Sequence, residues 1–135
     1  MDFLVNIDVD DLDAATRFYC AALDLRVGRR MGAAGLELLG GPAPIYLLAK
    51  AAGTPAASTT AQARTYARHW TPVHLDFVVA DIEAAVRKAV TAGATLEAPV
   101  ATQAWGKLAL LADPWGHGFC FVQFTGRGYD AIADA

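Results

Sequence analysis

The sequence predicts an α+β fold built from two tandem βαβββ modules, and two observations support this prediction. First, an apolar extended segment runs into an acidic helix start twice, as VDDLDAA at residues 9–15 and as VADIEAA at residues 79–85. Second, each half ends in two short apolar segments joined by a Gly/Pro turn, which is typical of a β-hairpin. A unit that recurs within one chain indicates an internal duplication.

The two helices are predicted by the spacing of their apolar residues. In the second helix these residues recur with the period of one helix face, at Ile82, Ala85, Val86, Ala89 and Val90. We expect Asp81 to cap the start of this helix and Gly93 to end it. The first helix has an equivalent stripe, capped by either Asp10 or Asp11, at Leu12, Ala15, Phe18, Tyr19, Ala22 and Leu23.

Four strands are expected in each module. One strand precedes each helix and one follows it, the latter at residues 26–31 and 95–100. The other two strands of each module form the hairpin, at residues 36–39 and 45–49 in the first module and at residues 108–111 and 119–124 in the second.

The organisation expected from this pattern is a single domain over residues 1–135. Its parts are a first module at 1–50, a linker at 51–71, a second module at 72–124 and a tail at 125–135. Ala, Thr, Gly and Pro dominate the start of the linker, which predicts a mobile loop at residues 51–60. Arg64 and Arg68 are expected to be solvated, although they could also bind an anionic group.

Composition excludes several classes of protein. The formal net charge is −3 and the pI is near 5.4, which argues against nucleic acid as a partner. No apolar run approaches the roughly 18 residues of a membrane span, and the N-terminus has no signal-peptide pattern. With only two cysteines, a disulfide framework is excluded. We therefore expect a cytoplasmic protein with neither a membrane nor a nucleic-acid partner.

Three local motifs and their order resemble a known superfamily. The motifs are VHLDFVVAD at residues 73–81, DPWGHG at 113–118, and Phe18-Tyr19 followed by LDL at 23–25. A duplicated βαβββ unit that ends in Asp-Pro-x-Gly and an apolar strand resembles the vicinal oxygen chelate superfamily, which includes glyoxalase I, bleomycin resistance proteins and extradiol dioxygenases. This resemblance implies two U-shaped mixed sheets around a cavity, helices on the outside, and a homodimer.

The resemblance also implies where a metal would bind. Metal-dependent members use four ligands, one from the first and one from the last strand of each half. His74 matches the usual histidine of the second half, whereas Cys120 stands where a glutamate is usual. In the first half the last-strand position is Tyr46, and the first-strand position is Leu4 or Asn6, depending on the alignment register.

Only one usual ligand therefore remains, and a metal needs several converging donors. The resemblance thus implies a cavity without a metal cofactor. The alternative is a nonstandard divalent-metal site in which His74 is joined by Cys120 or Asp76.

Each candidate residue has a functional and a structural interpretation. His74 could contact a ligand or act as a base, or it could be an internal histidine paired with Asp76. Cys120 could be a nucleophile beside His74, but packing is favoured because free cysteines are usually buried. Trp105 is a candidate for the cavity mouth, whereas Trp115, within a turn, is expected at the surface or in a dimer contact.

Polar residues on apolar strands complete the set of candidates. Asn6, Asp8, Tyr46 and Asp76 either satisfy one another or orient a ligand. The residues expected to bind a ligand are His74, Tyr46, Asp76, Cys120, Asn6 and Trp105. No catalytic residue is assigned.

Three functions are consistent with these observations. The leading hypothesis is a glyoxalase/bleomycin-resistance-like protein that binds a small molecule in a cavity between the modules without a metal. The alternative is a glyoxalase- or dioxygenase-like enzyme, an isomerase, lyase or oxygenase, with a divalent-metal site that includes His74. The third is a structural or regulatory dimer with no small ligand.

Overall fold

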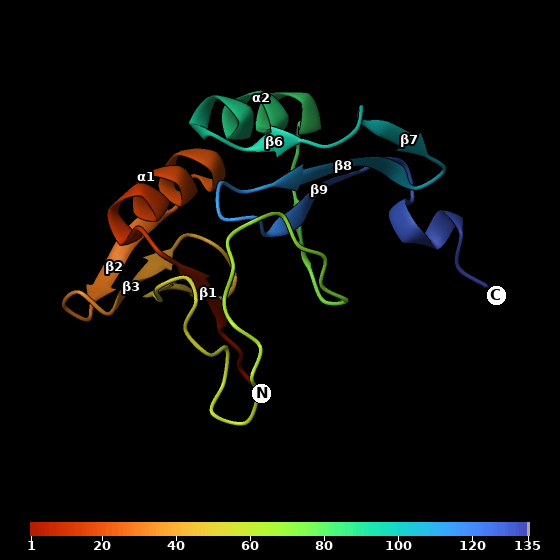
Figure 1. Cartoon of the computed structure of the whole chain (residues 1–135). Helices are drawn as coiled ribbons and strands as arrows, with labels where there is room; N and C mark the ends of the chain where they lie inside the picture. The colour runs from red at the N-terminus through yellow and green to blue at the C-terminus, as the bar shows by residue number, and fades with distance from the viewer. Residues whose placement is uncertain (135) are drawn as a thin grey trace. The chain divides into compact units, whose positions relative to one another are not determined.

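The computed structural model describes residues 1–134 and separates the chain into two compact units. The first unit is Met1–Ala67, and the second begins at Arg68. Each unit contains one long helix and one mixed sheet, which confirms the α+β class and the two βαβββ modules (Figure 1). Of the expected tail at 125–135, the final residue lies outside the described part of the chain.

The first unit is a four-stranded sheet with the order β1-β4-β3-β2. Strand β1 runs parallel to β4, and the other neighbours are antiparallel. Its elements are β1 (Val5–Val9), α1 (Leu12–Leu23), β2 (Arg26–Arg30), β3 (Gly35–Leu39) and β4 (Ile45–Ala49).

Helix α1 is capped by Asp11 rather than by Asp10. The Ala14 N–H donates to Asp11 Oδ1 at 2.9 Å, which satisfies one of the free amides at the helix start. The helix ends at Asp24, which adopts a left-handed conformation with φ 54°. Its buried stripe is the predicted one, with Ala15, Phe18, Tyr19 and Ala22 turned inward.

The sheet of the first unit has an apolar face and a polar face. The apolar side chains of its two central strands are almost completely buried beneath α1, and they are Leu36, Leu38, Ile45 and Leu47. Successive side chains of a strand point to opposite faces, so the residues between them lie on the other face. We call that face the open face of the first unit, and it carries Asn6, Asp8, Glu37 and Tyr46.

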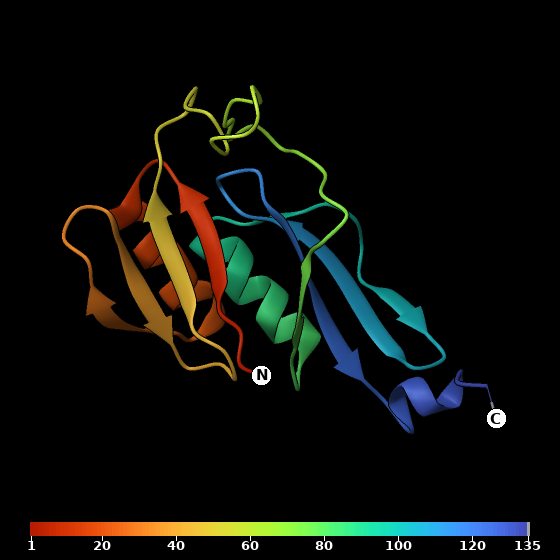
Figure 2. The same cartoon turned by 90° about the horizontal axis from the view of Figure 1, so that it is seen from below.

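The second unit repeats this plan with additional short strands. Its sheet has the order β5-β9-β8-β6, with β7 also paired to β8, and β5 runs parallel to β9 (Figure 2). Its elements are β5 (Leu75–Val78), α2 (Ile82–Ala92), β6 (Thr95–Leu96), β7 (Ala101–Gln103), β8 (Gly106–Ala112), β9 (Gly118–Phe124) and a 3₁₀ turn, η1 (Gly128–Ala131).

Helix α2 confirms its predicted boundaries. The Ala84 N–H donates to Asp81 Oδ1 at 3.0 Å, and Gly93 ends the helix with φ 123°. The strand expected at residues 95–100 is shortened to β6 at Thr95–Leu96, and β7 begins only at Ala101. Pro99 lies in the gap, and proline cannot donate a hydrogen bond to the ladder, so a continuous strand is interrupted there.

Residues 51–60, expected to form a mobile loop, are exposed and lie outside helices and strands, whereas Arg64, expected to be solvated, is partly buried. Arg64 Nε lies 2.7 Å from Asp8 Oδ2, and its guanidinium also donates to the Pro55 and Ala56 carbonyls. Pro55 and Ala63 form an isolated β-bridge. One partly buried guanidinium therefore contacts several parts of a segment whose composition indicates a flexible loop.

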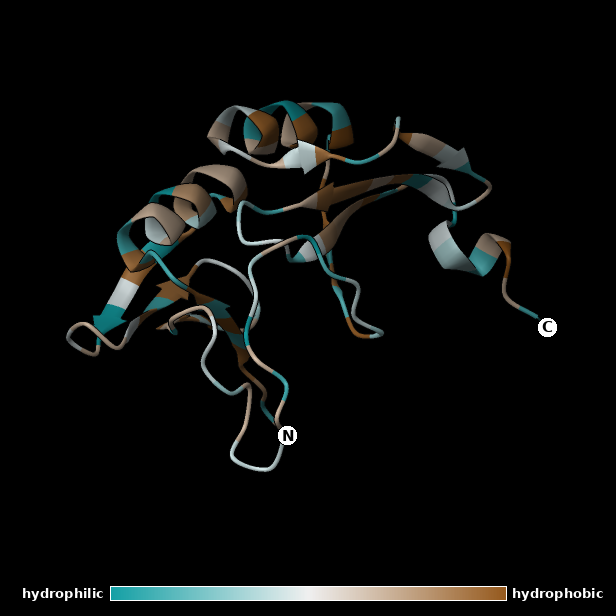
Figure 3. Ribbon diagram, in the orientation of Figure 1, coloured by the Kyte–Doolittle hydropathy of each residue, from teal (hydrophilic) through white to brown (hydrophobic). Residues whose placement is uncertain are grey.

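Apolar residues gather on the strands and on the inner helix faces, while the end of β2 is hydrophilic (Figure 3). Trp115, expected at the surface or in a dimer contact, is only 6% exposed. Asp113 Oδ1 accepts the N–H groups of Trp115 and His117 and so holds that turn closed. Within residues 1–134, no helix has the length and apolar character that crossing a membrane requires.

Candidate functional site

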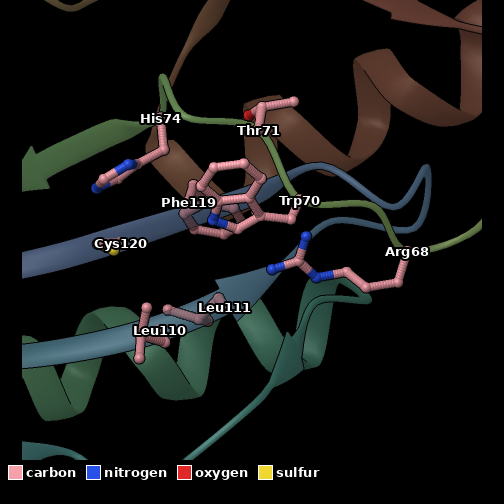
Figure 4. A pocket seen from close by; sticks show the side chains of 9 residues that line it. Arg68, Trp70, Thr71, His74, Leu110, Leu111, Phe119 and Cys120 are labelled. Atoms are coloured by element: carbon pink, nitrogen blue, oxygen red, sulfur yellow. The ribbon is translucent and has the colours of Figure 1, made fainter.

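The second unit contains a pocket between β8, β9 and the segment that leads into β5. Its volume is about 140 Å³. Figure 4 shows the side chains that surround it, which come from residues far apart in the sequence. The lining residues are Arg68, Trp70, Thr71, His74, Leu110, Leu111, Gly118, Phe119 and Cys120.

Arg68 fixes the leading segment to the sheet. Its guanidinium lies against Gly118, where an added Cβ would come within 2.7 Å of Arg68 Nη2. Nη2 also donates to Glu97 Oε2 at 3.0 Å, and the hydrogen bond from Arg68 lowers the pKa of Glu97. The charge of Arg68 is thus matched by Glu97, while the arginine side chain remains exposed, as expected.

His74, Asp76 and Cys120 form a cluster at one side of the pocket. His74 Nε2 lies 3.2 Å from Asp76 Oδ1, and both side chains are partly exposed. The Cys120 thiol is buried and donates a hydrogen bond to the Asp76 carboxylate. One potential ligand atom from each residue lies within 4.8 Å of the other two.

Cys120 is not an activated nucleophile in this arrangement. Burial raises the pKa of its thiol to about 12, with the Asp76 charge and the hydrogen bond to Asp76 acting in the same direction. A thiol must lose its proton to become nucleophilic, and activated cysteines have a lowered pKa. The environment of Cys120 therefore favours the packing role.

The strand registers decide which residues of the first unit correspond to this cluster. In the second unit Asp76 pairs with Cys120 across β5 and β9, and in the first unit Asn6 pairs with Tyr46 across β1 and β4. With Tyr46 in the place of Cys120, Asn6 corresponds to Asp76, and Leu4 corresponds to His74. The structure thus supports the alignment of the two repeats in which Leu4 takes the position equivalent to His74.

Tyr46 takes part in a charged network on the open face of the first unit. Its hydroxyl donates to Glu37 Oε1 at 2.8 Å and accepts a hydrogen bond from Arg29 Nη2 at 2.7 Å. Arg29 also donates its side-chain and backbone N–H groups to the Glu37 carboxylate. Both hydrogen-bonding capacities of the Tyr46 hydroxyl are therefore used within the unit.

Sequence reasoning missed Glu37 and Arg29 as members of this network. Hydrogen bonds from Arg29 lower the pKa of Glu37 to about 2, and the hydrogen bond to Glu37 raises the pKa of Tyr46. The signal in the sequence is Glu37 itself, a lone charge within an apolar strand. Its partner could not be identified before folding because β2 and β3 pair with a register shift between Val27 and Arg30.

The cluster fits a metal only in part. Imidazole, carboxylate and thiolate are donors that suit Zn²⁺, and three protein ligands with one open position is a common zinc arrangement. The corresponding residues of the first unit are an alkyl side chain, an amide and a hydroxyl already engaged with Arg29 and Glu37. A four-ligand set drawn from both modules therefore has no counterpart at these positions.

The six residues expected to bind a ligand are distributed over several places. His74 and Cys120 line the pocket, and Asp76 contacts His74. Tyr46 and Asn6 are neighbours on the sheet of the first unit. Trp105 packs against Phe124 and Tyr129, at ring-centroid distances of 6.2 and 5.2 Å, and does not line the pocket.

Trp70 is the tryptophan that lines the pocket, whereas the sequence analysis favoured Trp105 for the cavity mouth. The indole is 80% exposed and stands on the segment that precedes β5. Its place shortly before His74, which directly precedes β5, is the signal that could have identified it.

Comparison with known proteins identifies the family by sequence, and solved structures share the fold. The model of the family described as "Glyoxalase-like domain" matches residues 4–122. The anthracycline biosynthesis protein DnrV of Streptomyces peucetius is 34% identical over 131 residues, which is 96% of this chain and 43% of DnrV. The chain thus spans less than half the length of this relative.

Solved structures share the fold at low sequence identity. TioX from Micromonospora sp. ML1 has a TM-score of 0.71 and 19% identity, with coverage of 93% of this chain and 99% of TioX. A glyoxalase/bleomycin resistance protein/dioxygenase family enzyme from Burkholderia phytofirmans PsJN has a TM-score of 0.70, 19% identity and coverage of 90% and 97%. The fosfomycin resistance protein FosX from Listeria monocytogenes has a TM-score of 0.69, 15% identity and coverage of 91% and 92%.

The family match extends over both modules, and the repeated βαβββ plan agrees with it. The chain therefore belongs to the glyoxalase-like domain family, within the vicinal oxygen chelate superfamily.

Proposed function

We propose that this chain binds a small organic molecule in the pocket of the second unit, and that it does so without a metal. The observation that carries the proposal is the pocket, which combines the apolar side chains of Trp70 and Leu110 with the imidazole of His74. Small-molecule sites typically join an apolar lining to a few polar groups that orient the ligand.

The metal-free form is supported by how the three potential ligands satisfy one another. Asp76 contacts the His74 imidazole and accepts the Cys120 thiol hydrogen. Because the pKa of that thiol is raised to about 12, the sulfur stays protonated at neutral pH. Of the three, Cys120 is buried, and its thiol has a hydrogen-bond partner without a cation.

The names of two similar proteins indicate the kind of molecule. DnrV is described as an anthracycline biosynthesis protein and FosX as a fosfomycin resistance protein. Both names concern antibiotics, which are small organic molecules. We propose that this chain is a glyoxalase/bleomycin-resistance-like binding protein for a ligand of that size class.

We also propose that the protein is cytoplasmic and forms a homodimer. Cys20 and Cys120 are free thiols, as expected in the reducing cytoplasm. The superfamily resemblance supports a homodimer, and sedimentation equilibrium of the purified chain tests it.

The binding proposal is tested by ligand-induced stabilisation in the presence of a chelator. A ligand that binds the native state at about 100 times its Kd should stabilise it by about 2.7 kcal/mol. We expect a hit from a small-molecule panel to lose most of this effect in Trp70→Ala. Trp105→Ala is the matched control, since Trp105 lies outside the pocket lining. A panel that leaves the melting temperature unchanged, or a hit indifferent to Trp70→Ala, would contradict the proposal.

A metal-dependent enzyme of the glyoxalase or dioxygenase type is the second candidate. The observation in its favour is that donor atoms of His74, Asp76 and Cys120 lie within 4.8 Å of one another. These three residues would hold a divalent ion, which when bound supplies Lewis-acid polarisation of a substrate oxygen.

Metal analysis separates the two candidates. The purified chain is dialysed against Zn²⁺, Ni²⁺, Mn²⁺ or Fe²⁺, and the bound metal per chain is measured. The binding proposal predicts no stoichiometric metal. One tightly bound ion per chain that disappears in both His74→Ala and Cys120→Ser would establish the metal site instead.

A further inference from the structure

We infer that Glu97 and His117, which lie outside the pocket lining, are positioning residues that hold one wall of the pocket in the form that binds a ligand. This wall is the Trp70 segment, residues 68–71, which contributes three side chains to the lining. The inference rests on the proposed function, because it names the contacts on which binding in the same pocket depends.

The Trp70 segment has little of its own to keep it in place. Residues 68–71 lie outside helices and strands, so no strand ladder fixes their backbone. Trp70 is 80% exposed, and burial therefore contributes little to holding its indole beside the pocket (Figure 4). A segment of this kind opens easily unless contacts from its neighbours restrain it. The position of the indole thus depends on the contacts of Arg68 and His69.

Glu97 supplies the first restraint. Arg68 Nε donates to Glu97 Oε1, and Arg68 Nη2 donates to Glu97 Oε2 at 3.0 Å. Paired hydrogen bonds between a guanidinium and a carboxylate fix the orientation of the two groups as well as their distance. The Glu97 N–H donates to the Leu110 carbonyl at 2.9 Å. Glu97 therefore joins the Trp70 segment to β8, the strand that supplies Leu110 and Leu111 to the lining.

His117 supplies the second restraint. Its Nδ1 lies 3.1 Å from His69 Nε2, and the two rings meet edge to face with their centroids 4.9 Å apart. The His69 N–H also donates to the Gly116 carbonyl at 3.2 Å. His117 is itself held in its turn, because its N–H donates to Asp113 Oδ1 at 2.8 Å. The turn that precedes β9 therefore restrains the segment at His69.

These restraints bear on affinity because a ligand that packs against Trp70 gains more when the indole is already in place. Ordering a loop and an exposed side chain at the moment of binding costs free energy, and this cost is subtracted from the affinity. Removing Glu97 or His117 leaves every lining residue unchanged but frees the Trp70 segment to move. Affinity should therefore fall although no contact to the ligand has been removed.

The test uses toluene as the probe and the chelator-treated chain labelled with fluorotryptophan. Toluene suits the pocket, because its volume of about 140 Å³ is close to that of an apolar cavity of about 150 Å³ that holds benzene. The chain has three tryptophans, and the fluorine NMR signal of Trp70 is the one missing in Trp70→Phe. We expect the Kd of toluene to rise about threefold in Glu97→Ala and in His117→Ala, and about tenfold in the double variant.

Glu83→Ala is the matched control. Glu83 also faces a cation within the second unit, Lys107 at 3.8 Å, but neither residue lines the pocket. This variant should leave the Kd of toluene unchanged. Glu97→Gln keeps an acceptor oxygen for Arg68 and should retain most of the affinity. The Glu97 side chain is exposed and that of His117 is partly exposed, so their alanine variants should remain folded.

A second readout needs no ligand. In each alanine variant the Trp70 signal should move toward its position in the unfolded chain, while the Trp105 signal stays where it is. A general loss of stability would move both signals, so this pattern identifies a local release of the Trp70 segment.

The outcomes separate the inference from the proposed function. If toluene binds the double variant as tightly as the unmodified chain, while Trp70→Ala weakens binding, the inference is wrong and the proposed function stands. The same conclusion follows if toluene does not bind while a compound of the small-molecule panel does. An equal loss of affinity in Glu83→Ala would also contradict the inference. If no small molecule binds, both fail.

Discussion

At the scale of single residues, Glu37 is the clearest case of a side chain whose role depends on its neighbours. It is 5% exposed, although it is charged and lies on the open face of the first unit. Arg29 and Tyr46 together donate to both of its carboxylate oxygens. Gly28 makes room for it, because an added Cβ there would come within 2.5 Å of Glu37 Oε2.

Glu37 should make the stability of the fold depend on pH in the acid range. Its folded-state pKa is about 2, below the unfolded value of about 4.3. Its ionised form therefore stabilises the fold fully above the unfolded pKa, and this contribution is lost as the pH falls toward 2. We expect Glu37→Gln to be less stable than the unmodified chain at pH 7, with a difference that shrinks between pH 4.5 and 2. Urea unfolding at pH 7, 4.5, 3 and 2 measures it.

Tyr46→Phe is the companion variant for this measurement. It removes one donor to Glu37 and should raise the folded-state pKa of Glu37, so that the stabilisation by Glu37 is smaller at pH 7 and its loss is complete at a higher pH. If the free energy of unfolding varies with pH in the same way for the unmodified chain, Glu37→Gln and Tyr46→Phe, then Glu37 does not govern acid stability.

Gly28→Ala should destabilise the first unit by about 1–3 kcal/mol, the usual cost of inserting a methyl group into a well-packed site. The new Cβ would displace the Glu37 carboxylate from the backbone N–H of Arg29. Gly41→Ala is the matched control, since its Cβ would meet nothing closer than 3.8 Å. Chemical unfolding compares the two variants, and equal stabilities would refute the steric role of Gly28.

At the scale of elements, the segment between β4 and the second unit shows how one guanidinium organises a loop. Arg64 is joined to Asp8 of β1, to Thr54 and to two loop carbonyls. Tyr66 adds a hydrogen bond from its hydroxyl to the Lys50 carbonyl at 2.6 Å. The planar fork of arginine can satisfy several acceptors at once, which a lysine ammonium does less well.

Arg64→Ala should loosen this segment without unfolding the sheet. The Gly53 and Ala56 amides, which are hydrogen-bonded to the Arg64 and Gln62 carbonyls, should exchange about tenfold faster with solvent. Arg64→Lys should give an intermediate effect because it keeps the charge but loses the fork. Hydrogen exchange measured by mass spectrometry follows both, with Arg127→Ala as a surface control. Unchanged exchange in Arg64→Ala would show that backbone contacts alone order the segment.

At the scale of the whole molecule, the duplicated sequence produces two units, each with its own hydrophobic core. In the first unit Leu36, Leu38 and Leu47 are almost completely buried, and in the second Leu111 and Phe121 are. Each core forms between one helix and one sheet, as expected for a layered α+β unit.

A substitution that creates a cavity in one core should accelerate hydrogen exchange first in the unit that contains that core. Leu47→Ala and Leu111→Ala should each reduce the free energy of unfolding by about 2–5 kcal/mol, because buried methyl groups are lost and a void remains. Hydrogen exchange should accelerate first in β3 and β4 for Leu47→Ala and first in β8 and β9 for Leu111→Ala. Equal acceleration in both units for either variant would show that the cores open together.

Much of the fold could be predicted from local patterns. The alternation of apolar residues, the caps Asp11 and Asp81, and the stop at Gly93 act within one or two turns of chain, so a reader of the sequence can find them. The early end of the strand expected at residues 95–100 was missed, although Pro99 indicates it.

Of the candidate site, only the residues on or directly beside the predicted strands could be predicted from the sequence. His74 and Cys120 follow from the ligand positions that the family resemblance implies, and Asp76 from its place on the same strand face as His74. The structure brings the three together. Trp70, Arg68 and the Arg29–Glu37 pair depend on how an irregular segment or a shifted register places side chains, which no local spacing encodes.

The sequence by itself determined the duplicated βαβββ plan and the scarcity of metal ligands, because composition and periodicity are properties of the chain alone. Only the tertiary structure decided which polar groups satisfy one another. Asp76 contacts His74 and the Cys120 thiol, and Glu37 binds Arg29 and Tyr46. The physical reason is that a buried charge or hydroxyl requires a partner within hydrogen-bond reach, and strand pairing and loop paths determine which residue stands there.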